Sequence, residues 1–453
     1  MFHRFVPVTC RRLPDDVGCR EPLTVNRSPE DPGFWILTTV KPRPLDAQIQ
    51  ISDKSGIEID RKYEPIASLQ VVAHMAIIRR FILVQDSWIK LGVVRKHLGM
   101  SSSQHSAALF EARGKKFNVS KRQTPNPGPD EVLIEAKAFA INPIDNIQQT
   151  FGYHVTTYPS VLGSDVAGVV VAVGSDVNNF KIGDRVTAFA PCLFKYGSPD
   201  YGAFQEKVLV PQQFVVSIPS SMSFDNAAML PLAVSTAWLA FLCLGIPRDT
   251  QFKPVEKNGI LIWSAASSVG SAVLQIAVSM GFNVYATASP KHHAYLQTLA
   301  KGPGKVTLFD YHDTAIAAKI LVASHDDHVF IVHAIVAAGE VGPCIQVLDK
   351  VKGGDDVLAK VVSIPWAMNL LWWKFFPKWG HTRVKFVEAM GDEAAIKETY
   401  EFIFHKWLTP KLVDGGYVPS PTPFLIEGGI ESIQAGVDKW KEGVSGTKIV
   451  VKM

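Results

Sequence analysis

The sequence predicts an α/β protein in which a β-rich region is followed by a doubly wound parallel sheet. Residues 107–220 contain short apolar runs separated by turn residues, a pattern typical of strands in a small, partly open barrel. From about residue 226 the pattern becomes helical and then alternates between strand and helix. Between residues 259 and 287, an apolar run, a turn of small residues, a helix pattern and a second apolar run follow one another. This order predicts a βαβ unit, from which doubly wound sheets are built.

Length, composition and charge limit the class of protein. The chain has 453 residues, 47% of them hydrophobic, so it can form roughly two to three domains and is too apolar to be mostly disordered. The formal net charge of +4 is small for a nucleic-acid-binding protein of this length. The five Cys residues are an odd number without a close pair, which excludes a disulfide framework. We therefore expect a cytoplasmic protein that binds neither nucleic acid nor membrane.

The first 99 residues differ from the rest of the chain. They hold 15 Lys and Arg against 11 Asp and Glu, so the whole net charge lies in them. Pro-rich pieces alternate with charged residues, and no helical or strand period is sustained. Four Arg residues in the first 20 positions suggest a mitochondrial transit peptide, but Asp15 and Asp16 argue against one, because such peptides avoid acids. We expect residues 1–99 to be a poorly ordered extension or a gene-model artefact.

Turns and alternation mark single strands in the β-rich region. Val132–Ala138 follows the turn cluster Pro125–Asp130, and Gly163–Gly174 contains an uninterrupted apolar run. A Gly-Asp turn then leads into Arg185–Phe189. Each of these segments is expected to be a strand.

The small-residue turn after residue 263 is a candidate phosphate site. A helix is expected after it to about Met280, and the backbone N–H groups at such a helix start can approach a pyrophosphate when no large side chain blocks them. Only Gly270 remains of the three glycines usual in this turn, so a turn that merely packs helix on strand is the alternative. The residues predicted to bind the cofactor here are Ser264, Ala265, Ser267, Ser268, Val269 and Gly270.

The end of the next strand, Asn283–Thr287, favours NADP(H) as the cofactor. An NAD site usually has Asp or Glu there, about 20 residues after the turn, to bind the ribose hydroxyls. This chain has Ser289 and Lys291 instead, a hydroxyl and a cation that suit a 2′-phosphate. A solvated loop is the alternative.

Several motifs follow one another in a fixed order from residue 141 onward. They are Ile141–Asp145, Tyr158–Asp165, Val173–Gly174 with Lys181–Val186, Leu230–Ala237, Ala265–Gly270 and Gly446–Val451. In this order, residues from about 100 to 453 resemble the zinc-free branch of the medium-chain dehydrogenase/reductases, the quinone and enoyl reductases. The chain looks similar to fungal members, including stand-alone enoyl reductases of secondary metabolism.

The resemblance implies a division into domains and further cofactor contacts. It implies a GroES-like domain over residues 100–225, a Rossmann NADPH-binding domain over 226–384, and a return of 385–453 to the first domain. Thr236 would contact the nicotinamide side, and Tyr311 would flank the adenine ribose phosphate. A homodimer and a polyketide synthase partner are compatible with the family.

The ligands of the family's zinc sites are missing. Zinc-dependent members carry a Cys before the Asn-Pro region and a His-Glu pair after a glycine, where this chain has Phe139–Ile141 and Ser164–Asp165. A catalytic zinc needs three protein ligands. Cys192, Cys243 and Cys344 are isolated and are expected to be buried small apolar residues. We predict that no metal is bound.

Reduction without a metal needs a hydride donor, a polarising hydrogen bond and a proton source. In mitochondrial-type enoyl reductases of the family, a Tyr after the Asn-Pro motif is the proposed acid, and Tyr153 lies 11 positions after Asn142. A phenol is protonated at neutral pH and can donate to an enolate. The alternatives are His154 as the acid, or a Tyr153 that only packs under the loop. Asn142 and Asp145 are expected to shape the floor of the catalytic pocket.

An aromatic segment near the end of the second domain has two interpretations. Residues 366–379 hold six aromatic side chains, interrupted by Lys and Pro, in a run too short and too charged to span a bilayer. The segment is expected to pack in the core or a subunit interface, or to form an apolar lip for an acyl or polyketide chain.

Together these features predict an NADPH-dependent reductase that transfers a hydride, without a metal, to an activated C=C bond of an enoyl, enone or quinone substrate. Reduction of a ketone or aldehyde is one alternative. NADPH binding without catalysis is another, because serines replace glycines in the phosphate turn.

Overall fold

A computed structural model describes residues 103–339, 341–350, 360–363, 378–379, 382–387 and 392–453, and four short strands before residue 59. The chain divides into two compact units, residues 1–101 and 102–453. In the first unit, β1 (Leu23–Arg27) pairs with β2 (Trp35–Thr39), and β3 (Gln50–Ser52) pairs with β4 (Gly56–Glu58), both antiparallel. Residues 1–99 are expected to be poorly ordered. Apart from these four strands, they lie outside the described residues.

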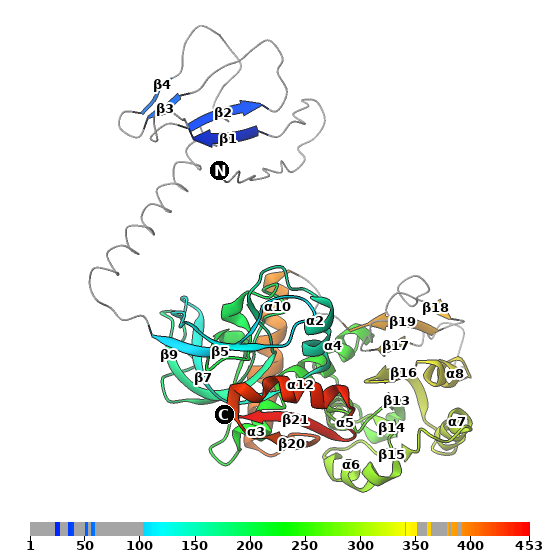
Figure 1. Cartoon of the computed structure of the whole chain (residues 1–453). Helices are drawn as coiled ribbons and strands as arrows, with labels where there is room; N and C mark the ends of the chain where they lie inside the picture. The colour runs from blue at the N-terminus through cyan, green and yellow to red at the C-terminus, as the bar shows by residue number, and fades with distance from the viewer. Residues whose placement is uncertain are drawn as a thin grey trace. The chain divides into compact units, whose positions relative to one another are not determined.

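The β-rich region of the second unit forms two sheets (Figure 1). The larger has the order β12-β10-β9-β7-β21-β20, with β11 also paired to β7, and all its pairs are antiparallel except β20 with β21. The smaller has the order β6-β5-β8. The strands predicted near residues 107, 132, 166 and 185 are confirmed as β5, β7, β9 and β10. The bounds are β5 (Gln104–Phe110), β6 (Asn118–Gln123), β7 (Glu131–Ala140), β8 (Ser160–Val161), β9 (Asp165–Val173), β10 (Arg185–Phe189), β11 (Lys207–Pro211), β12 (Val215–Ser217), β20 (Thr422–Ile426) and β21 (Thr447–Lys452).

A glycine in β9 allows β7 and β9 to approach each other where their register shifts. The register shifts between Ala136 and Ala138, and Gly168 faces Ala136 at this irregularity. A Cβ atom on Gly168 would lie 2.0 Å from the carbonyl oxygen of Glu135. Only glycine fits such a backbone contact, and an isolated glycine inside a strand often marks such a site.

The second sheet has the order β15-β14-β13-β16-β17-β19-β18, and its strands are parallel except for the pair β18 and β19. This is the strand order of a doubly wound nucleotide-binding fold, which confirms the predicted α/β class. The bounds are β13 (Asn258–Trp263), β14 (Asn283–Thr287), β15 (Val306–Phe309), β16 (Phe330–Val336), β17 (Lys360–Ser363), β18 (Lys378–Trp379) and β19 (Thr382–Phe386).

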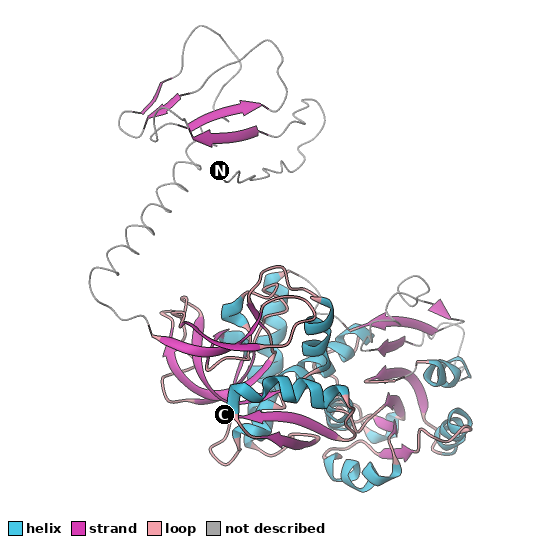
Figure 2. Cartoon of the chain, in the orientation of Figure 1, coloured by secondary structure: helices cyan, strands magenta, loops and turns pink. Residues whose placement is uncertain are grey.

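Helices cover both faces of this sheet, as the secondary-structure view shows (Figure 2). Side chains of β13 alternate between two cores: Ile260 and Ile262 pack with α4 and α5, whereas Leu261 and Trp263 pack with α7 and α8. The alternation follows from the period of two in a strand, and a strand buried on both faces is apolar throughout. The helices are α4 (Pro231–Leu244), α5 (Ser268–Ser279), α6 (His293–Leu299), α7 (Ile316–Asp326) and α8 (Gly342–Lys350).

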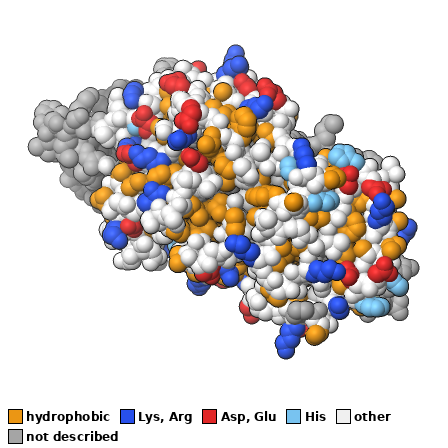
Figure 3. Space-filling view, turned by 90° about the horizontal axis from the view of Figure 1, so that it is seen from below, with side chains coloured by type: hydrophobic (Ala, Val, Ile, Leu, Met, Phe, Trp, Pro, Cys, Tyr) orange, Lys and Arg blue, Asp and Glu red, His pale blue; other side chains and the backbone are white. Residues whose placement is uncertain are grey.

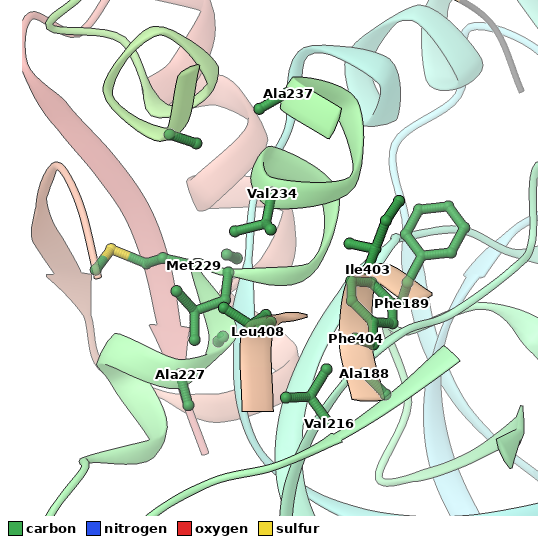
Figure 4. Packing of buried hydrophobic residues seen from close by; sticks show 14 of the residues in the cluster. Ala188, Phe189, Val216, Ala227, Met229, Val234, Ala237, Ile403, Phe404 and Leu408 are labelled. Carbon is green, nitrogen blue, oxygen red and sulfur yellow. The ribbon is translucent and has the colours of Figure 1, made fainter. Parts of the chain in front are cut away.

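One run of the remaining helices packs between the strands of the larger β sheet and helix α4. The run from α10 through the π-helical η5 to α11 is continuous in the chain, and its Ile403, Phe404 and Leu408 pack in one apolar cluster with Phe189 of β10 and Val234 of α4 (Figure 4). One core therefore extends from the strands of the larger β sheet to the helices beside the parallel sheet. The bounds are α2 (Pro143–Phe151), α3 (Phe224–Ala228), α10 (Glu393–Tyr400), η5 (Glu401–Leu408), α11 (Thr409–Val413) and α12 (Ile433–Lys441), with short 3-10 turns η1 (Pro199–Tyr201), η2 (Gln212–Phe214), η3 (Pro254–Glu256), η4 (Pro290–His292) and η6 (Gly429–Ser432).

The helical region expected from about residue 226 is two helices, α3 and α4, because Pro231 starts a new helix at its first position. The stretch Phe224–Leu244 is apolar and long enough to cross a membrane by length and composition alone. Within it, 78% of the most apolar 18-residue window is buried inside the described protein, as expected of a core helix.

A glutamine ties α5 to the segment that leads back to the barrel. The buried Gln275 accepts a hydrogen bond from Val418 N at 2.9 Å, and its Nε2 donates to Val418 O at 3.0 Å and to Ser420 Oγ at 3.1 Å. The chain then continues through β20 to β21, which pairs with β7. The helix after the phosphate turn is thus bonded directly to the returning segment.

Two further predictions concern the cysteines and the aromatic segment 366–379. Cys192, Cys243 and Cys344 are buried, as predicted. The aromatic segment 366–379 lies outside the described residues except for the backbone of β18, so neither interpretation of it is decided.

Candidate active site

The phosphate turn predicted after β13 is a helix start fixed to the neighbouring strand. Ser264 N donates to Thr287 Oγ1 at 3.0 Å, and Ala265 N donates to Thr287 O at 2.8 Å. Ser264 has a φ of 66°, a left-handed conformation that is uncommon for a residue other than glycine. The turn therefore leaves β13 sharply, at the carboxyl end of the strand where doubly wound folds bind ligands.

Ser267 and Gly270 form the first turn of α5. Ser267 Oγ accepts from Gly270 N at 3.1 Å and donates to Ser264 O at 2.8 Å, so Ser267 caps the helix. A Cβ atom on Gly270 would lie 2.1 Å from Ser264 O, so only glycine lets the helix start this close to the strand. Ser268 and Val269 take the first two helical positions, where backbone N–H groups have no acceptor within the helix. Both are only half-buried, so an anion can reach them.

The residues expected to recognise the adenosine end lie at the ends of β14 and β15. Ser289 Oγ donates to the Tyr311 hydroxyl oxygen at 3.4 Å, which places these two predicted residues side by side. Lys291 is exposed two residues after Ser289, in η4. The three residues thus follow the carboxyl ends of the neighbouring parallel strands β14 and β15. Figure 3 shows basic and acidic side chains interspersed over one face of the molecule, without a single sign of charge dominating it.

Histidines and an aspartate surround this cluster. His292 Nε2 is 3.0 Å from Ser445 Oγ, and a Cβ atom on Gly446 would lie 2.3 Å from the His292 ring, which links η4 to the closing motif of the chain. Burial lowers the pKa of His292, and the neighbouring Lys291 lowers it further. Asp310 accepts from His312 Nδ1 at 2.8 Å, and hydrogen bonds from His312 lower the pKa of this carboxyl group.

A second group of polar side chains is buried where α2 begins. Asn142 N donates to Asp145 Oδ2 at 2.7 Å, and Asn142 Nδ2 donates to Asp165 Oδ2 at 2.9 Å. Lys448 Nζ donates to Asn142 Oδ1 and lies 3.4 Å from Asp165 Oδ2. Asp165 Oδ1 accepts from Leu232 N of α4 at 2.8 Å. We name Asn142, Asp145, Asp165 and Lys448 the buried polar cluster.

Asp165 is surrounded by donors only. The Asn142 amide and the Leu232 N–H group donate hydrogen bonds to it, and the Lys448 ammonium forms an ion pair with it, as an ionised carboxylate requires. Burial raises the pKa of Asp165, while the Lys448 ammonium acts in the opposite direction and favours the ionised form. The Asp165 side chain is fully buried and that of Lys448 is 5% exposed, so water screens the pair little.

Asp145 has a different environment from Asp165. Burial raises its pKa to about 8, and the negative charge of Asp165 acts in the same direction. Its Oδ1 has no hydrogen-bond partner, and neither does Gln148 Nε2 one turn further along α2. The Cys192 thiol donates to Gln148 Oε1 at 3.6 Å. Asn142 and Asp145 are thus bonded within the protein, and a part for either in catalysis stays a prediction.

Tyr153 and Thr236 lie on different elements. Tyr153 follows the left-handed Gly152 that ends α2, is 44% exposed, and its ring centroid is 4.4 Å from that of His154. His154 stacks in turn on Tyr196 at 5.7 Å. Thr236 is half-buried on α4, one helical turn beyond Leu232. Tyr153 is therefore accessible, and does not pack beneath a loop.

Comparison with known proteins identifies the family. Residues 128–220 match the family model of the alcohol dehydrogenase GroES-like domain. The trans-enoyl reductase tndF of Aspergillus flavipes is 41% identical over 354 residues, which cover 77% of this chain and 99% of that protein. The chain belongs to the medium-chain dehydrogenase/reductase superfamily of oxidoreductases.

Two further comparisons agree with this assignment. The trans-enoyl reductase tazE of Aspergillus terreus is 43% identical over 270 residues, 58% of this chain and 87% of that protein. The quinone oxidoreductase of Coxiella burnetii superposes with a TM-score of 0.58 at 23% identity, over 78% of this chain and 100% of that one. The latter shows the superfamily fold, a GroES-like domain with a Rossmann domain, which confirms the architecture predicted from the motifs.

Sequence reasoning missed the partners of the predicted residues. Asp165 and Lys448 each stand in a superfamily motif, but Lys448 contacts Asn142 across 306 positions of the chain, so no local pattern announces the contact. The contact of His292 with Ser445 spans 153 positions and is equally hidden from local patterns. Among the described residues, no group of three or more His, Cys, Asp or Glu side chains is arranged to hold a metal ion.

The raised pKa of Asp145 predicts how stability depends on pH. Its pKa is about 8 in the folded protein against an ordinary 3.8, so between these values the folded state holds one more proton than the unfolded state. The free energy of unfolding therefore decreases as pH rises, by about 1.4 kcal/mol per pH unit from this group. We expect Asp145→Asn, which keeps the acceptor for Asn142 N, to remove this contribution, so that the variant gains on the wild type from about pH 5 to about pH 8.

Urea denaturation at a series of pH values measures the difference. Asp249→Asn, at an exposed position, is the matched control and should follow the wild-type profile. Parallel profiles for Asp145→Asn and the wild type would show that Asp145 ionises normally.

Proposed function

We propose that the protein is an NADPH-dependent reductase that transfers a hydride, without a metal, to the C=C bond of an enoyl substrate. The observation that carries the proposal is the 41% identity to a trans-enoyl reductase over almost the whole length of that protein. The buried polar cluster supports the metal-free part. Asp165 stands where zinc-dependent members carry the second residue of their His-Glu pair. Hydrogen bonds from Leu232 and Asn142 and the ion pair with Lys448 already occupy its carboxylate.

The cofactor residues fit NADPH. The N–H groups of Ser268 and Val269, the first two residues of α5, would bind the pyrophosphate. Ser289, Tyr311 and Lys291 offer two hydroxyl groups and a cation to the 2′-phosphate, and no described carboxylate stands at the end of β14 to bind the ribose hydroxyls. Asp310, directly after β15, is the nearest described acid, and its Oδ1 accepts hydrogen bonds from His312 N and Nδ1. Thr236 would face the nicotinamide.

When bound, NADPH supplies the hydride, which adds to the β-carbon of a C=C–C=O group and leaves an enolate. The chain must then deliver one proton to the α-carbon. We assign this to the Tyr153 hydroxyl, which is accessible beside the end of α2. His154, in ring contact with Tyr153, is the alternative donor.

The substrate is an enoyl thioester, either as a small molecule or attached to the carrier domain of a polyketide synthase. The trans-enoyl reductases similar to this chain support that class. Enones and quinones give an enolate of the same kind on hydride addition. Ketones and aldehydes require hydride addition to the carbonyl carbon instead.

Removing the cation at the proposed 2′-phosphate site should affect NADPH alone. We expect Lys291→Ala to raise the dissociation constant of NADPH by about tenfold or more, since charge-assisted bonds of this kind contribute about 1.5–3 kcal/mol, and to leave the weak binding of NADH unchanged. Lys397→Ala, an exposed lysine on α10, is the matched control. Fluorescence titration gives both affinities, and an equal loss for NADPH and NADH would remove Lys291 from 2′-phosphate recognition.

The proton donor is tested with NADPH and the crotonyl thioester of N-acetylcysteamine. We expect Tyr153→Phe to lower kcat by about 100-fold, because general acids contribute about 10²–10⁴. Tyr196→Phe keeps its ring on His154 and should leave kcat within about twofold. Full activity in Tyr153→Phe with a loss in His154→Ala would transfer the role to His154. A wild type that oxidises NADPH only with aldehydes or ketones would refute enoyl reduction.

A further inference from the structure

Helix α4 lacks a cap of its own. Its N-cap residue is Leu230, whose side chain has no oxygen, and Pro231 at the first helical position has no N–H group. The next residue, Leu232, has an N–H group without an acceptor inside the helix. Asp165, at the start of β9, accepts that hydrogen bond at 2.8 Å. A buried carboxylate from a different element therefore caps α4, and its negative charge also suits the positive end of the helix dipole.

The same carboxylate lies at the start of a second helix. Asn142 is the N-cap residue of α2, and its Nδ2 donates to Asp165 Oδ2 at 2.9 Å. Lys448 of β21 fixes the other side of this amide by donating to Asn142 Oδ1, and its charge compensates that of Asp165 at 3.4 Å. One ion pair thus connects the starts of α2 and α4 to the last strand of the chain.

The residues assigned to the two ends of the reaction lie on α4 and directly after α2. Tyr153 follows the end of α2, and Thr236 lies one turn along α4 from Leu232. The starts of both helices are therefore held by one buried carboxylate, and a displacement of either helix changes the distance between the proton donor and the nicotinamide side. Misplacement by about 1 Å can cost about 100-fold in rate.

We propose that Asp165 and Lys448 are positioning residues, which hold the proton-donor helix α2 and the cofactor helix α4 in one fixed relation. The proposal rests on the proposed function for the identity of the reaction. Neither residue contacts the substrate. The positioning depends on the hydrogen bonds that the side chain of residue 165 makes to the two helix starts, and not on its charge.

Two double variants separate positioning from stability. Asp165→Asn with Lys448→Met removes both charges. The oxygen of the new amide can still accept from Leu232 N. Its nitrogen can donate to Asn142 Oδ1, which no longer accepts from the lysine. Asp165→Leu with Lys448→Met also removes both charges and leaves neither hydrogen bond. Replacing a buried ion pair by apolar side chains is often neutral for stability, so both proteins are expected to fold. If the leucine variant is not recovered folded, Asp165→Ala with Lys448→Met takes its place.

The readouts are kcat and KM with the crotonyl thioester, the dissociation constant of NADPH, and hydrogen exchange in the first turn of α4. We expect the asparagine variant to stay within about threefold of the wild type, and the leucine variant to lose about tenfold or more in kcat and to bind NADPH more weakly. Glu135→Gln with Lys207→Met, which removes a charge pair between β7 and β11, should leave kcat unchanged.

Equal kinetic constants in the two double variants would overturn the positioning role. If the wild type reduces no enoyl thioester, the proposed function fails by itself. The NADPH affinity and the exchange rates of α4 then still decide the proposal, because neither needs a substrate. Equal values of both in the two variants overturn it, and weaker binding with faster exchange in the leucine variant supports it.

Discussion

A carboxylate that is fully buried must be satisfied by donors, and Asp165 shows how much of this protein depends on that requirement. Its oxygens accept hydrogen bonds from Asn142 and from Leu232, and Lys448 supplies the compensating charge. The three donors come from the start of α2, the start of α4 and the last strand. The barrel sheet, the cofactor domain and the end of the chain thus meet at one side chain. An apolar residue there would leave two helix starts and one buried lysine without partners.

The fold could be predicted well from the sequence because its signals are local. The partial alternation in Val132–Ala138 and the apolar run over residues 259–263 are each local features of one strand, and both strands occur where the pattern placed them. The break between α3 and α4 was not predicted, since the apolar composition continues across it. Pro231 is the physical cause, because proline starts a helix more readily than it continues one.

The candidate site could be predicted only as far as short segments carry it. Ser267 and Gly270 stand three positions apart, and a helix start of this kind requires a cap and a close approach at that spacing. By contrast, the contact of Lys448 with Asn142 joins residues 306 positions apart, and the contact of His292 with Ser445 spans 153. Such contacts arise from the return of the chain through β20 and β21, which no single motif encodes. The raised pKa of Asp145 was equally hidden, because it comes from burial and from the negative charge of Asp165, 20 positions further along the chain.

In the reaction that we propose, the chain directs a hydride from NADPH to the β-carbon of an enoyl group and a proton to the α-carbon. Isotope position tests it most directly, with wild-type protein, the crotonyl thioester of N-acetylcysteamine and NADPH deuterated at its hydride position. We expect a butyryl thioester with one deuterium on the β-carbon. With unlabelled NADPH in heavy water, we expect one deuterium from the solvent on the α-carbon instead. Deuterium on the former carbonyl carbon, or a product without cofactor-derived deuterium, would contradict it.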